Sequence, residues 1–568
     1  MDANVPADRA RPWWREPQLA VLALVVIGIY FTRLTTLTIR GEESRRARVA
    51  VEILESGDWI VPTQQRQVYL SRPPLGSYPI ALLGMLRGKV DLLAVRLPTV
   101  TAVLLTSVLV YGYARTFLSS GGALASGLAF ATMAQVMEIG RLAETEGLFT
   151  LLVAASLLLW HWGYSRGWSG GITWATGYAF CALAGLAKGP QGPVYFVAVV
   201  LVYLAVRRDW KTLFGRPHAI GIACGAAVLG AWQVPYLLRT DLNCAIGIWT
   251  KNASQRFADN GNASTLLAHL ASYPLEVFAC MLPWSLLLLR YADRRFLAAL
   301  GSARANVAFL TSAVLVTFPT VWLASTAKGR YFMPLYPCFA VLVGIVIDRC
   351  WTADPASHLR TVWRYYSTMV ACGLAAAAMV IGVASWLPIS KLAAIAQPAL
   401  FAVVYLVCAL SAAAIVLRSA TKTPLAGLVA IALVLGLTSA GVMVNAYARA
   451  SHDASAAVAT LKRKLPPGEP LVSFGRVDHL FAYLYETPIV YRRLPETAHD
   501  VDAGVQYFAI DGGPKPVAEL PFAWEPVATI VLDRNKMPKP ARTVIVGRRV
   551  EVSVAKKRAK PETVRRSN

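Results

Sequence analysis

Charged residues are scarce in this sequence. They make up 15% of its 568 residues, whereas 56% of the residues are hydrophobic and the mean hydropathy is +0.48. Soluble proteins carry about a quarter charged residues. The balance therefore excludes an ordinary soluble domain and is typical of a membrane protein.

Paired cysteines are also lacking. The eight cysteines are scattered, none forms a Cys-x-x-Cys motif, and the last 120 residues contain none. This pattern indicates small apolar side chains rather than a disulfide framework or a metal site. His269 and His479 have no partner at ligand spacing. The sequence requires no cofactor, and a divalent metal stays an alternative whose ligands it does not reveal.

Acidic residues are few beside basic ones, 32 against 56, which gives a net charge of +24. Most basic residues fall in short loops between apolar runs, and no nucleic-acid-binding motif is found among them. Cytoplasmic loops of membrane proteins have this bias, so we expect contact with membrane lipids and not with nucleic acid. The N-terminus has no cleavable signal pattern, which predicts that the first apolar run is a membrane helix.

Apolar runs long enough to cross a bilayer need about 20 residues. That criterion predicts thirteen spans, at about 17–38, 89–113, 120–139, 146–164, 172–187, 190–206, 218–237, 272–289, 305–325, 332–348, 365–387, 396–417 and 425–446. The apolar stretch 74–86 is short and begins with Pro-Pro, so it is interpreted as a partly buried or re-entrant segment.

A cytoplasmic N-terminus puts the basic short loops inside, as the positive-inside rule requires. The opposite face then receives the loops 39–88 and 238–271, the turns near 140–145, 188 and 326–331, and the tail 447–568. The chain is thus expected to divide into a membrane domain, 1–446, and an extracytoplasmic domain, 447–568. Short β-branched and aromatic segments after residue 450 predict a small α/β fold there, with a disordered end at "KKRAKPETVRRSN".

Ionisable residues converge on the extracytoplasmic face. They are Glu42, Glu43, Arg45 and Arg46; Tyr69 and Arg72; Arg141, Glu144 and Glu146; Lys188; and Arg256, Asp259, Lys328, Arg330 and Tyr331. Each has an ordinary alternative. Lys188 could extend to lipid headgroups, Glu144 or Glu146 could stabilise a helix N-terminus, Tyr331 could be an interfacial aromatic, and Glu42 and Glu43 could lie in a solvated loop.

Together these residues favour a functional site, because ionisable groups at membrane depth are costly and usually functional. "Arg-Pro-Pro" and "Lys-Gly-Pro" add irregular backbone, which is tolerated at that depth where it lines a cavity. Bases beside carboxylates suit an anionic substrate such as a lipid phosphate, held by arginine and lysine while a carboxylate acts at the reacting centre.

The stretches "EESRRARVAVEILESGDWIVP" and "YLSRPPLGSYPIALL" resemble the N-terminal block of the ArnT family, the 4-amino-4-deoxy-L-arabinose lipid A transferases. That family shows Asp-Glu-Thr-Arg-Tyr-Ala, then Ser-Gly-Asp-Trp-Ile-Val-Pro, then Tyr-x-x-Lys-Pro. It belongs to the class C glycosyltransferases, which use polyprenyl-phosphate sugars. The resemblance extends over the membrane region and implies a membrane all-α fold of about thirteen spans with a small periplasmic domain.

The resemblance also implies roles for individual residues. Glu42 falls on the catalytic aspartate, Glu43 on its neighbouring glutamate, which we interpret as a contact for a cation or substrate, and Glu146 on a second functional aspartate. The remaining matches are expected to bind the carrier phosphate or lipid: Arg45, Tyr69, Arg72, Lys188, Arg256 and Tyr331, together with Lys328 and Arg330 of the same turn. The sequence departs from the family with Glu at 42 and 146, Arg at 72 in place of Lys, and Arg46 in place of Tyr. Arginine is not equivalent to lysine at a phosphate site.

The function implied is transfer of a sugar, most simply 4-amino-4-deoxy-L-arabinose, from undecaprenyl phosphate to lipid A at the periplasmic face of the bacterial inner membrane. Such an enzyme modifies lipopolysaccharide and confers polymyxin resistance, and it is expected to be monomeric. A related transferase acting on another glycan, lipid or protein is the first alternative. A lipid-linked sugar transporter is the second, although the sequence lacks the inverted repeat and mid-membrane charges typical of transporters.

Overall fold

The computed structural model describes residues 12–258, 263–354, 357–384, 399–502, 504–512, 520–533 and 542–550. The described chain forms two compact units, one that ends at Ala450 and one that begins at Ser451, with residues 65–67 grouped in the second. The predicted boundary after residue 446 lies within helix α23 (Val444–Ala450). The predicted disordered end, residues 556–568, lies outside the described residues.

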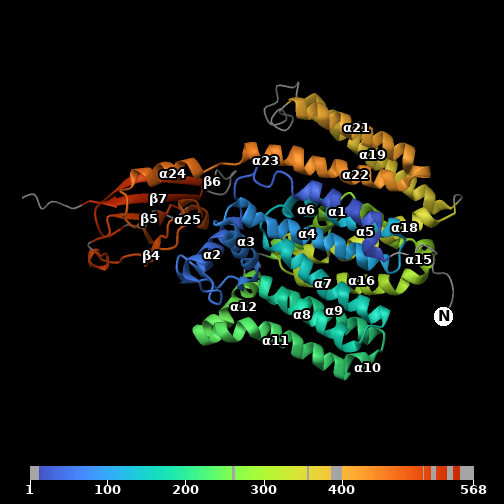
Figure 1. Ribbon diagram of the computed structural model, residues 1–568, viewed down its shortest axis with the longest axis horizontal. Coiled ribbons are helices and arrows are strands. Elements are labelled where there is room, and N and C mark those ends of the chain that lie inside the picture. Colours follow the sequence, from blue (N-terminus) through green and yellow to red (C-terminus); the bar gives the residue numbers. More distant parts are fainter. Residues whose placement is uncertain are drawn as a thin grey trace, which may run out of the picture. The chain divides into compact units, whose positions relative to one another are not determined.

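The first unit is helical (Figure 1). Its helices up to residue 239 are α1 (Pro17–Tyr30), α2 (Glu43–Ser56), α3 (Tyr78–Arg87), α4 (Leu92–Arg115), α5 (Ser120–Ala131), α6 (Ala134–Ile139), α7 (Thr145–Arg166), α8 (Gly170–Lys188), α9 (Gln191–Val206), α10 (Trp210–Leu213) and α11 (Arg216–Arg239). Those that follow are α12 (Leu242–Ala258), α13 (Ala263–Cys280), α14 (Ser285–Leu288), α15 (Arg294–Ala298), α16 (Arg304–Thr317), α17 (Pro319–Trp322), α18 (Tyr336–Thr352), α19 (His358–Ala384), α21 (Ala399–Lys422), α22 (Pro424–Leu437) and α23.

Short elements connect these helices. The 3₁₀ helices are η2 (Trp13–Arg15), η3 (Pro74–Gly76), η4 (Leu289–Ala292), η5 (Gly301–Ala303) and η6 (Gly329–Leu335), and η7 (Thr438–Met443) is a π-helix. A two-stranded hairpin joins β1 (Thr63–Gln64) and β2 (Gln67–Val68).

Eight helical segments of the described chain are long and apolar enough to cross a membrane, or nine if one bent pair is a single span. The prediction of a multi-pass membrane protein is therefore confirmed, whereas the count of thirteen is not. Three predicted spans appear as shorter apolar helices, α1, α5 and α9. The bent pair, Ser264–Cys280 and Ser285–Ala292, turns by 113° inside the predicted span 272–289. Length and composition alone did not reveal such breaks.

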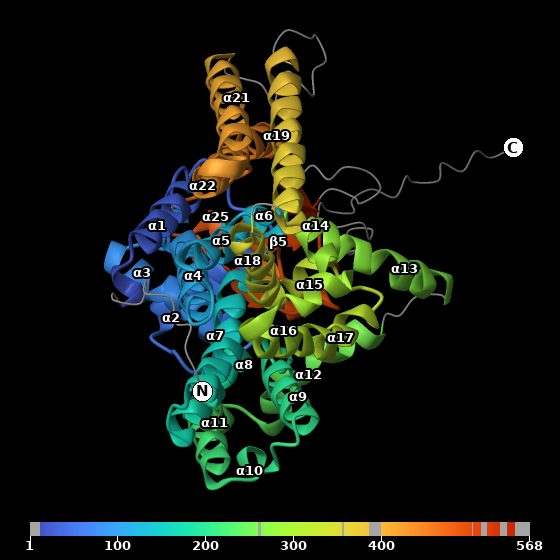
Figure 2. The same cartoon turned by 90° about the vertical axis from the view of Figure 1, so that its right-hand side faces the viewer.

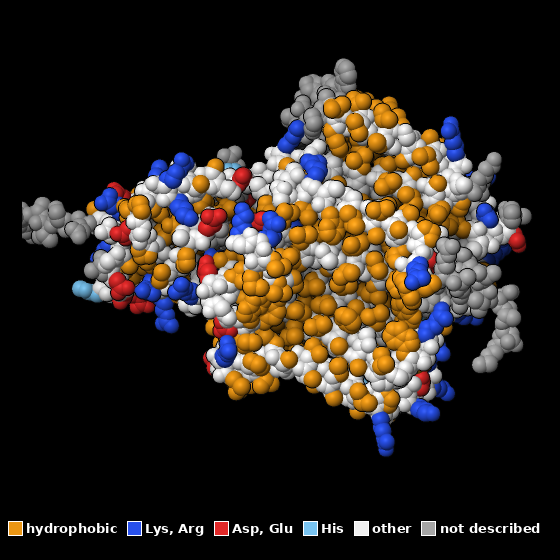
Figure 3. Space-filling model, in the orientation of Figure 1, with side chains coloured by type: hydrophobic (Ala, Val, Ile, Leu, Met, Phe, Trp, Pro, Cys, Tyr) orange, Lys and Arg blue, Asp and Glu red, His pale blue; other side chains and the backbone are white. Residues whose placement is uncertain are grey.

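Packing within this unit brings α4, α5 and α7 side by side, with α8 between α7 and α11 (Figure 1). Figure 2 shows α19 and α21 as a pair of long helices that pack together. Hydrophobic side chains cover much of the visible surface of the helical unit (Figure 3). Leu86 and Leu238 are among its most exposed large hydrophobic residues. A surface of this kind suits a hydrocarbon environment.

The second unit contains a five-stranded sheet in the order β4-β3-β5-β7-β6. The strands are β3 (Val472–Phe474), β4 (Val490–Arg492), β5 (Tyr507–Asp511), β6 (Trp524–Asp533) and β7 (Arg542–Arg549), and the helices are α24 (Ser455–Lys464), α25 (His479–Tyr485) and the 3₁₀ helix η8 (Ala498–Asp500). β3 pairs with β4 and β5 in parallel, and β7 pairs with β5 and β6 antiparallel. Val472, Phe474, Phe508 and Ile510 pack in its core.

Candidate active site

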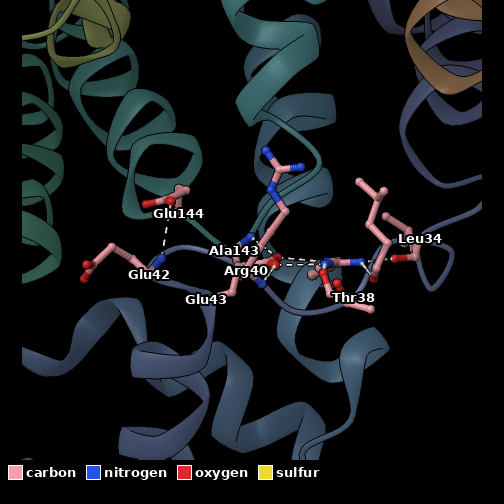
Figure 4. A network of polar contacts seen from close by, with 9 residues as sticks. Leu34, Thr38, Arg40, Glu42, Glu43, Ala143 and Glu144 are labelled. Atoms are coloured by element: carbon pink, nitrogen blue, oxygen red, sulfur yellow. Dashed lines mark hydrogen bonds and ion pairs between the residues drawn. The ribbon is translucent and has the colours of Figure 1, made fainter. Parts of the chain in front are cut away.

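Glu43 is the buried member of the acidic pair (Figure 4). Its Oε1 accepts hydrogen bonds from Arg96 Nε (2.8 Å) and the backbone N–H of Ala143 (2.9 Å), and its Oε2 accepts from Arg96 Nη2 (2.8 Å) and the backbone N–H of Arg40 (3.1 Å). Arg96 also donates to the carbonyl groups of the loop that follows α1, at Leu34, Leu37 and Thr38. Glu43 and Arg96 thus fix this loop to the turn before α7.

Glu42 lies at the N-terminus of α2 and has a different environment. Its side chain is 29% exposed and forms an ion pair with Arg45 at 2.8 Å. Figure 4 shows it pointing away from the network around Glu43. A carboxylate with one partly exposed partner can still accept a proton or contact a substrate. The structure therefore separates two residues that the sequence presents as one pair.

The second acidic group approaches Glu42 through the backbone. The N–H of Glu42 lies 3.5 Å from Glu144 Oε1. Gly41 precedes it with φ of +58°, and a Cβ at that position would lie 2.9 Å from the same Glu144 oxygen. Glycine adopts this left-handed backbone without strain, and it lets the Glu144 carboxylate approach where a Cβ would displace it. The turn before α7 and the start of α2 are therefore in close contact.

Glu144 and Glu146 have separate cationic partners. Glu146 forms an ion pair with Lys188 at 3.2 Å, and both side chains are buried. Glu144 faces Arg330 at 3.7 Å. Burial raises the pKa of the Glu144 carboxyl, the negative charge of Glu146 raises it further, and Arg330 opposes both. The structure thus brings together Glu146, Lys188 and Arg330, which the sequence predicted as members of one site.

Replacing Glu144 with glutamine is expected to change how stability depends on pH. Because the pKa of Glu144 is raised in the folded state, its contribution to stability is present below about pH 4.3 and is lost as the pH rises through the raised value. The thermal unfolding midpoint of the wild type should therefore fall, relative to Glu144→Gln, as the pH rises from about 4 toward neutrality. Unfolding midpoints that run parallel over this range would contradict the assignment.

Tyr69 and Arg72 lie beside these carboxylates. The Tyr69 hydroxyl accepts a hydrogen bond from Arg46 Nη1 at 3.3 Å, and Arg72 donates to the Thr145 hydroxyl. Burial acts to raise the pKa of the Tyr69 phenol, but the charges of Arg46, Arg72 and Arg45 outweigh it, so that the pKa is lowered. A phenol and two guanidinium groups in one place suit an anionic ligand.

The residues of the turn 328–331 have different environments in the structure. Tyr331 lies near two cations, with Lys188 Nζ 5.4 Å and the Arg330 guanidinium 5.5 Å from its ring centroid. Lys328 is exposed, and its carbonyl oxygen accepts a hydrogen bond from Tyr273. Within the described residues, no contact joins the Lys328 ammonium group to the other predicted residues. Arg256 lies in α12, and its side chain is outside the described part of the chain.

Three residues in or around the site were not assigned roles from the sequence. Arg46 was grouped with the converging ionisable residues and noted as a departure from the family pattern, but it was given no role. Arg96 lies within a predicted span, and no sequence pattern pointed to Thr145. An arginine within an apolar run is a signal that could have identified Arg96. Arg46 follows Glu42 by four residues and so shares a helix face with it. Arg141, grouped with the site from the sequence, instead donates to the carbonyl groups of Ile29 and Thr32 near the end of α1.

No group of three or more His, Cys, Asp or Glu side chains that could hold a metal ion is found among the described residues. The carboxylates of the site instead lie next to arginine and lysine.

Comparisons with known proteins identify relatives of the chain. A family model described as dolichyl-phosphate-mannose-protein mannosyltransferase matches residues 71–233. A Pseudomonas aeruginosa protein named undecaprenyl phosphate-alpha-4-amino-4-deoxy-L-arabinose arabinosyl transferase is 29% identical over 58% of this chain and 59% of its own length. An Edwardsiella ictaluri protein of the same name is 29% identical over 53% of each chain. The chain thus matches between half and three fifths of the length of these curated relatives.

A solved structure extends the comparison to nearly the whole chain. ArnT from Cupriavidus metallidurans, bound to undecaprenyl phosphate, aligns with a TM-score of 0.69 and 18% identity over 93% of this chain and 97% of its own. The chain has the ArnT fold. The apo form of the Cupriavidus metallidurans protein aligns with a TM-score of 0.65. The resemblance to the ArnT family seen in the sequence is therefore confirmed by named relatives and by the fold.

Proposed function

We propose that this chain is a glycosyltransferase that moves 4-amino-4-deoxy-L-arabinose from undecaprenyl phosphate to a phosphate of lipid A. The observation that carries the proposal is a cluster of carboxylates and cations on the ArnT fold, here called the charged cluster. Its members are Glu42, Glu144, Glu146, Arg45, Arg46, Arg72, Lys188 and Arg330. The relatives named for this reaction support the same substrates.

The reaction breaks the bond between the anomeric carbon and a phosphate oxygen and forms a bond from that carbon to the acceptor oxygen. The electron pair of the broken bond stays on the carrier phosphate, whose charge changes from about −1 to −2. Arg72, Lys188 and Arg330 stabilise this developing charge, which is the part of the transition state that fixed cations favour most. Arg256 is assigned to the same phosphate from the sequence.

Glu42 acts on the side of the acceptor. Its carboxylate orients the acceptor, and it takes the proton if the acceptor is a hydroxyl group. A phosphate acceptor is already a nucleophile and needs only to be oriented. Glu146, held by Lys188 at 3.2 Å, positions that ammonium group toward the carrier phosphate. Whether a divalent cation takes part is tested by comparing transfer in EDTA with transfer after Mg²⁺ is restored.

The proposal also includes the arrangement in the membrane. The shorter apolar helices α1, α5 and α9, together with α8 and the bent pair, would complete thirteen spans. The active site then faces the periplasm from the bacterial inner membrane, because the basic short loops lie on the opposite side. A single copy of the chain carries all residues of the charged cluster, so a monomer suffices for activity.

A second candidate is supported by one observation. The mannosyltransferase family model covers residues 71–233, which include Arg72, Glu146 and Lys188. A related transferase would keep the lipid-phosphate donor and use another sugar or acceptor. The two functions differ in the acceptor that gains mass and not in the residues that hold the carrier.

The test is a transfer assay with purified protein. Labelled undecaprenyl-phosphate-aminoarabinose is incubated with lipid A, with a protein acceptor and with a glycan acceptor, and each product is weighed by mass spectrometry. Label on lipid A together with release of undecaprenyl phosphate is the expected result. Label on another acceptor would favour the related transferase. Movement of intact donor across a vesicle membrane without transfer would favour a transporter and contradict the proposal.

A further inference from the structure

Arg46 has a buried donor without a partner. It lies in the first turn of α2 and is 4% exposed, and its Nη1 donates to the Tyr69 hydroxyl at 3.3 Å. Its Nε is buried and has no hydrogen-bond partner in the described structure. Buried guanidinium N–H groups are almost always satisfied, because an unsatisfied donor is costly. An acceptor from outside the chain would complete the site.

Another arginine of the same helix shows that this is a local property of Arg46. Arg48 is equally buried, but it pairs with Glu52 at 3.0 Å and with Glu55 at 3.3 Å. Arg46 forms no ion pair within the described residues. Burial acts to lower its pKa, but the electrostatic effects of Tyr69, Glu42, Glu144 and Glu146 outweigh it, so that the pKa is raised. The guanidinium therefore stays charged and lies within the field of these carboxylates.

The charged cluster has further unsatisfied groups and an excess of positive charge. Arg330 Nε is buried without a partner, like Arg46 Nε, and so is one acceptor, Glu146 Oε2. Cations outnumber carboxylates in the cluster. The cations are Arg45, Arg46, Arg72, Lys188 and Arg330, and the carboxylates are Glu42, Glu144 and Glu146. Arg46 and Lys188 are buried, whereas Arg45, Arg72 and Arg330 are partly exposed. A buried charge without a counter-ion is costly, so an excess of cations around these residues favours a bound anion.

We infer that Arg46 binds the carrier phosphate directly through Nε and makes the site prefer the doubly charged phosphate monoester over the singly charged diester. The inference rests on the proposed function, because it names undecaprenyl phosphate as the anion. The fork of a guanidinium group reaches Tyr69 through Nη1 while Nε faces the ligand, a combination that the point charge of lysine does not offer. Arg46 thereby stabilises the charge that appears on the phosphate as the sugar leaves.

The test compares two ligands and three variants of the full-length protein in detergent. Affinities are measured for undecaprenyl phosphate and for its monomethyl ester, which carries one charge less. Arg46→Gln is expected to weaken binding of undecaprenyl phosphate about tenfold to a hundredfold, the range for a hydrogen bond to a charged group, and to weaken binding of the ester less. Arg46→Lys is expected to restore part of the loss. Arg87→Gln, at an arginine paired with Asp91 on α3, should leave both affinities unchanged.

The ratio of the affinities for undecaprenyl phosphate and its monomethyl ester distinguishes a direct contact of Arg46 with the phosphate from a structural role. Equal losses for both ligands, with a lowered unfolding temperature, would overturn the inference, and so would unchanged affinity for undecaprenyl phosphate. Failure of the wild type to bind either ligand would instead contradict the proposed function. The two failures are therefore distinguishable.

Discussion

Glu42→Gln is expected to lower sugar transfer by at least about a hundredfold while the protein stays folded. Positioned acid–base groups contribute about 10²–10⁴-fold to rates, and the amide of glutamine neither accepts a proton nor carries the negative charge. Folding should be preserved because Glu42 forms one ion pair within the described residues, with Arg45 at 2.8 Å, and is 29% exposed. Pairs with that much exposure contribute about 0–1 kcal/mol.

The measurement is single-turnover transfer from labelled donor, with thermal unfolding of the same preparation. Glu55→Gln is the matched control, because Glu55 lies on the same helix, is 32% exposed, pairs with Arg48 at 3.3 Å and is not a member of the charged cluster. This control should transfer sugar at the rate of the wild type. Near-normal turnover in Glu42→Gln would contradict its assignment to the chemistry.

Glu43→Gln, in contrast to Glu42→Gln, is expected to cause a large loss of stability. The change leaves Arg96 charged and buried without its counter-ion, and removal of one partner from a buried pair costs about 3–5 kcal/mol. The loop after α1 and the turn before α7 lose their common anchor, since Arg40 and Ala143 both donate to this carboxylate. The unfolding temperature and the yield of folded protein should both fall well below those of Glu42→Gln.

A double variant tests this explanation. Glu43→Leu combined with Arg96→Leu removes both charges and should be more stable than either single variant, because no buried charge is left unpaired. Additive losses would show that the two side chains act independently. An unfolding temperature of Glu43→Gln equal to that of the wild type would show that Glu43 does not hold the two loops.

Much of this site could be predicted from the sequence. Apolar runs and the distribution of basic residues assign the loops to one side of the membrane, and that assignment already groups Glu42, Glu146, Lys188 and Arg330. The structure joins Glu146 to Lys188 and places Arg330 next to Glu144. Topology was sufficient here because the groups lie at the ends of helices, where a position along the chain fixes a position across the membrane.

The difference between Glu42 and Glu43 could not be predicted. It depends on Arg96, which lies 53 residues after Glu43 in the sequence, and on the backbone N–H of Ala143. These partners depend on how α2, α4 and α7 pack against one another. The apolar sequence of a membrane span contains little information about which helices it packs against. The same holds for Arg46, whose unpaired Nε depends on which carboxylates come near enough to form an ion pair. It holds as well for breaks within spans, such as the 113° bend after Cys280.

The most direct test of the central claim is the mass of lipid A in cells. The gene is expressed in a bacterial strain that makes undecaprenyl-phosphate-aminoarabinose but lacks its own transferase, and lipid A is extracted and weighed by mass spectrometry. The proposed function predicts lipid A heavier by one aminoarabinose residue with the wild type and unmodified lipid A with Glu42→Gln. Unmodified lipid A with the wild type, present in the membrane at normal levels, would contradict it.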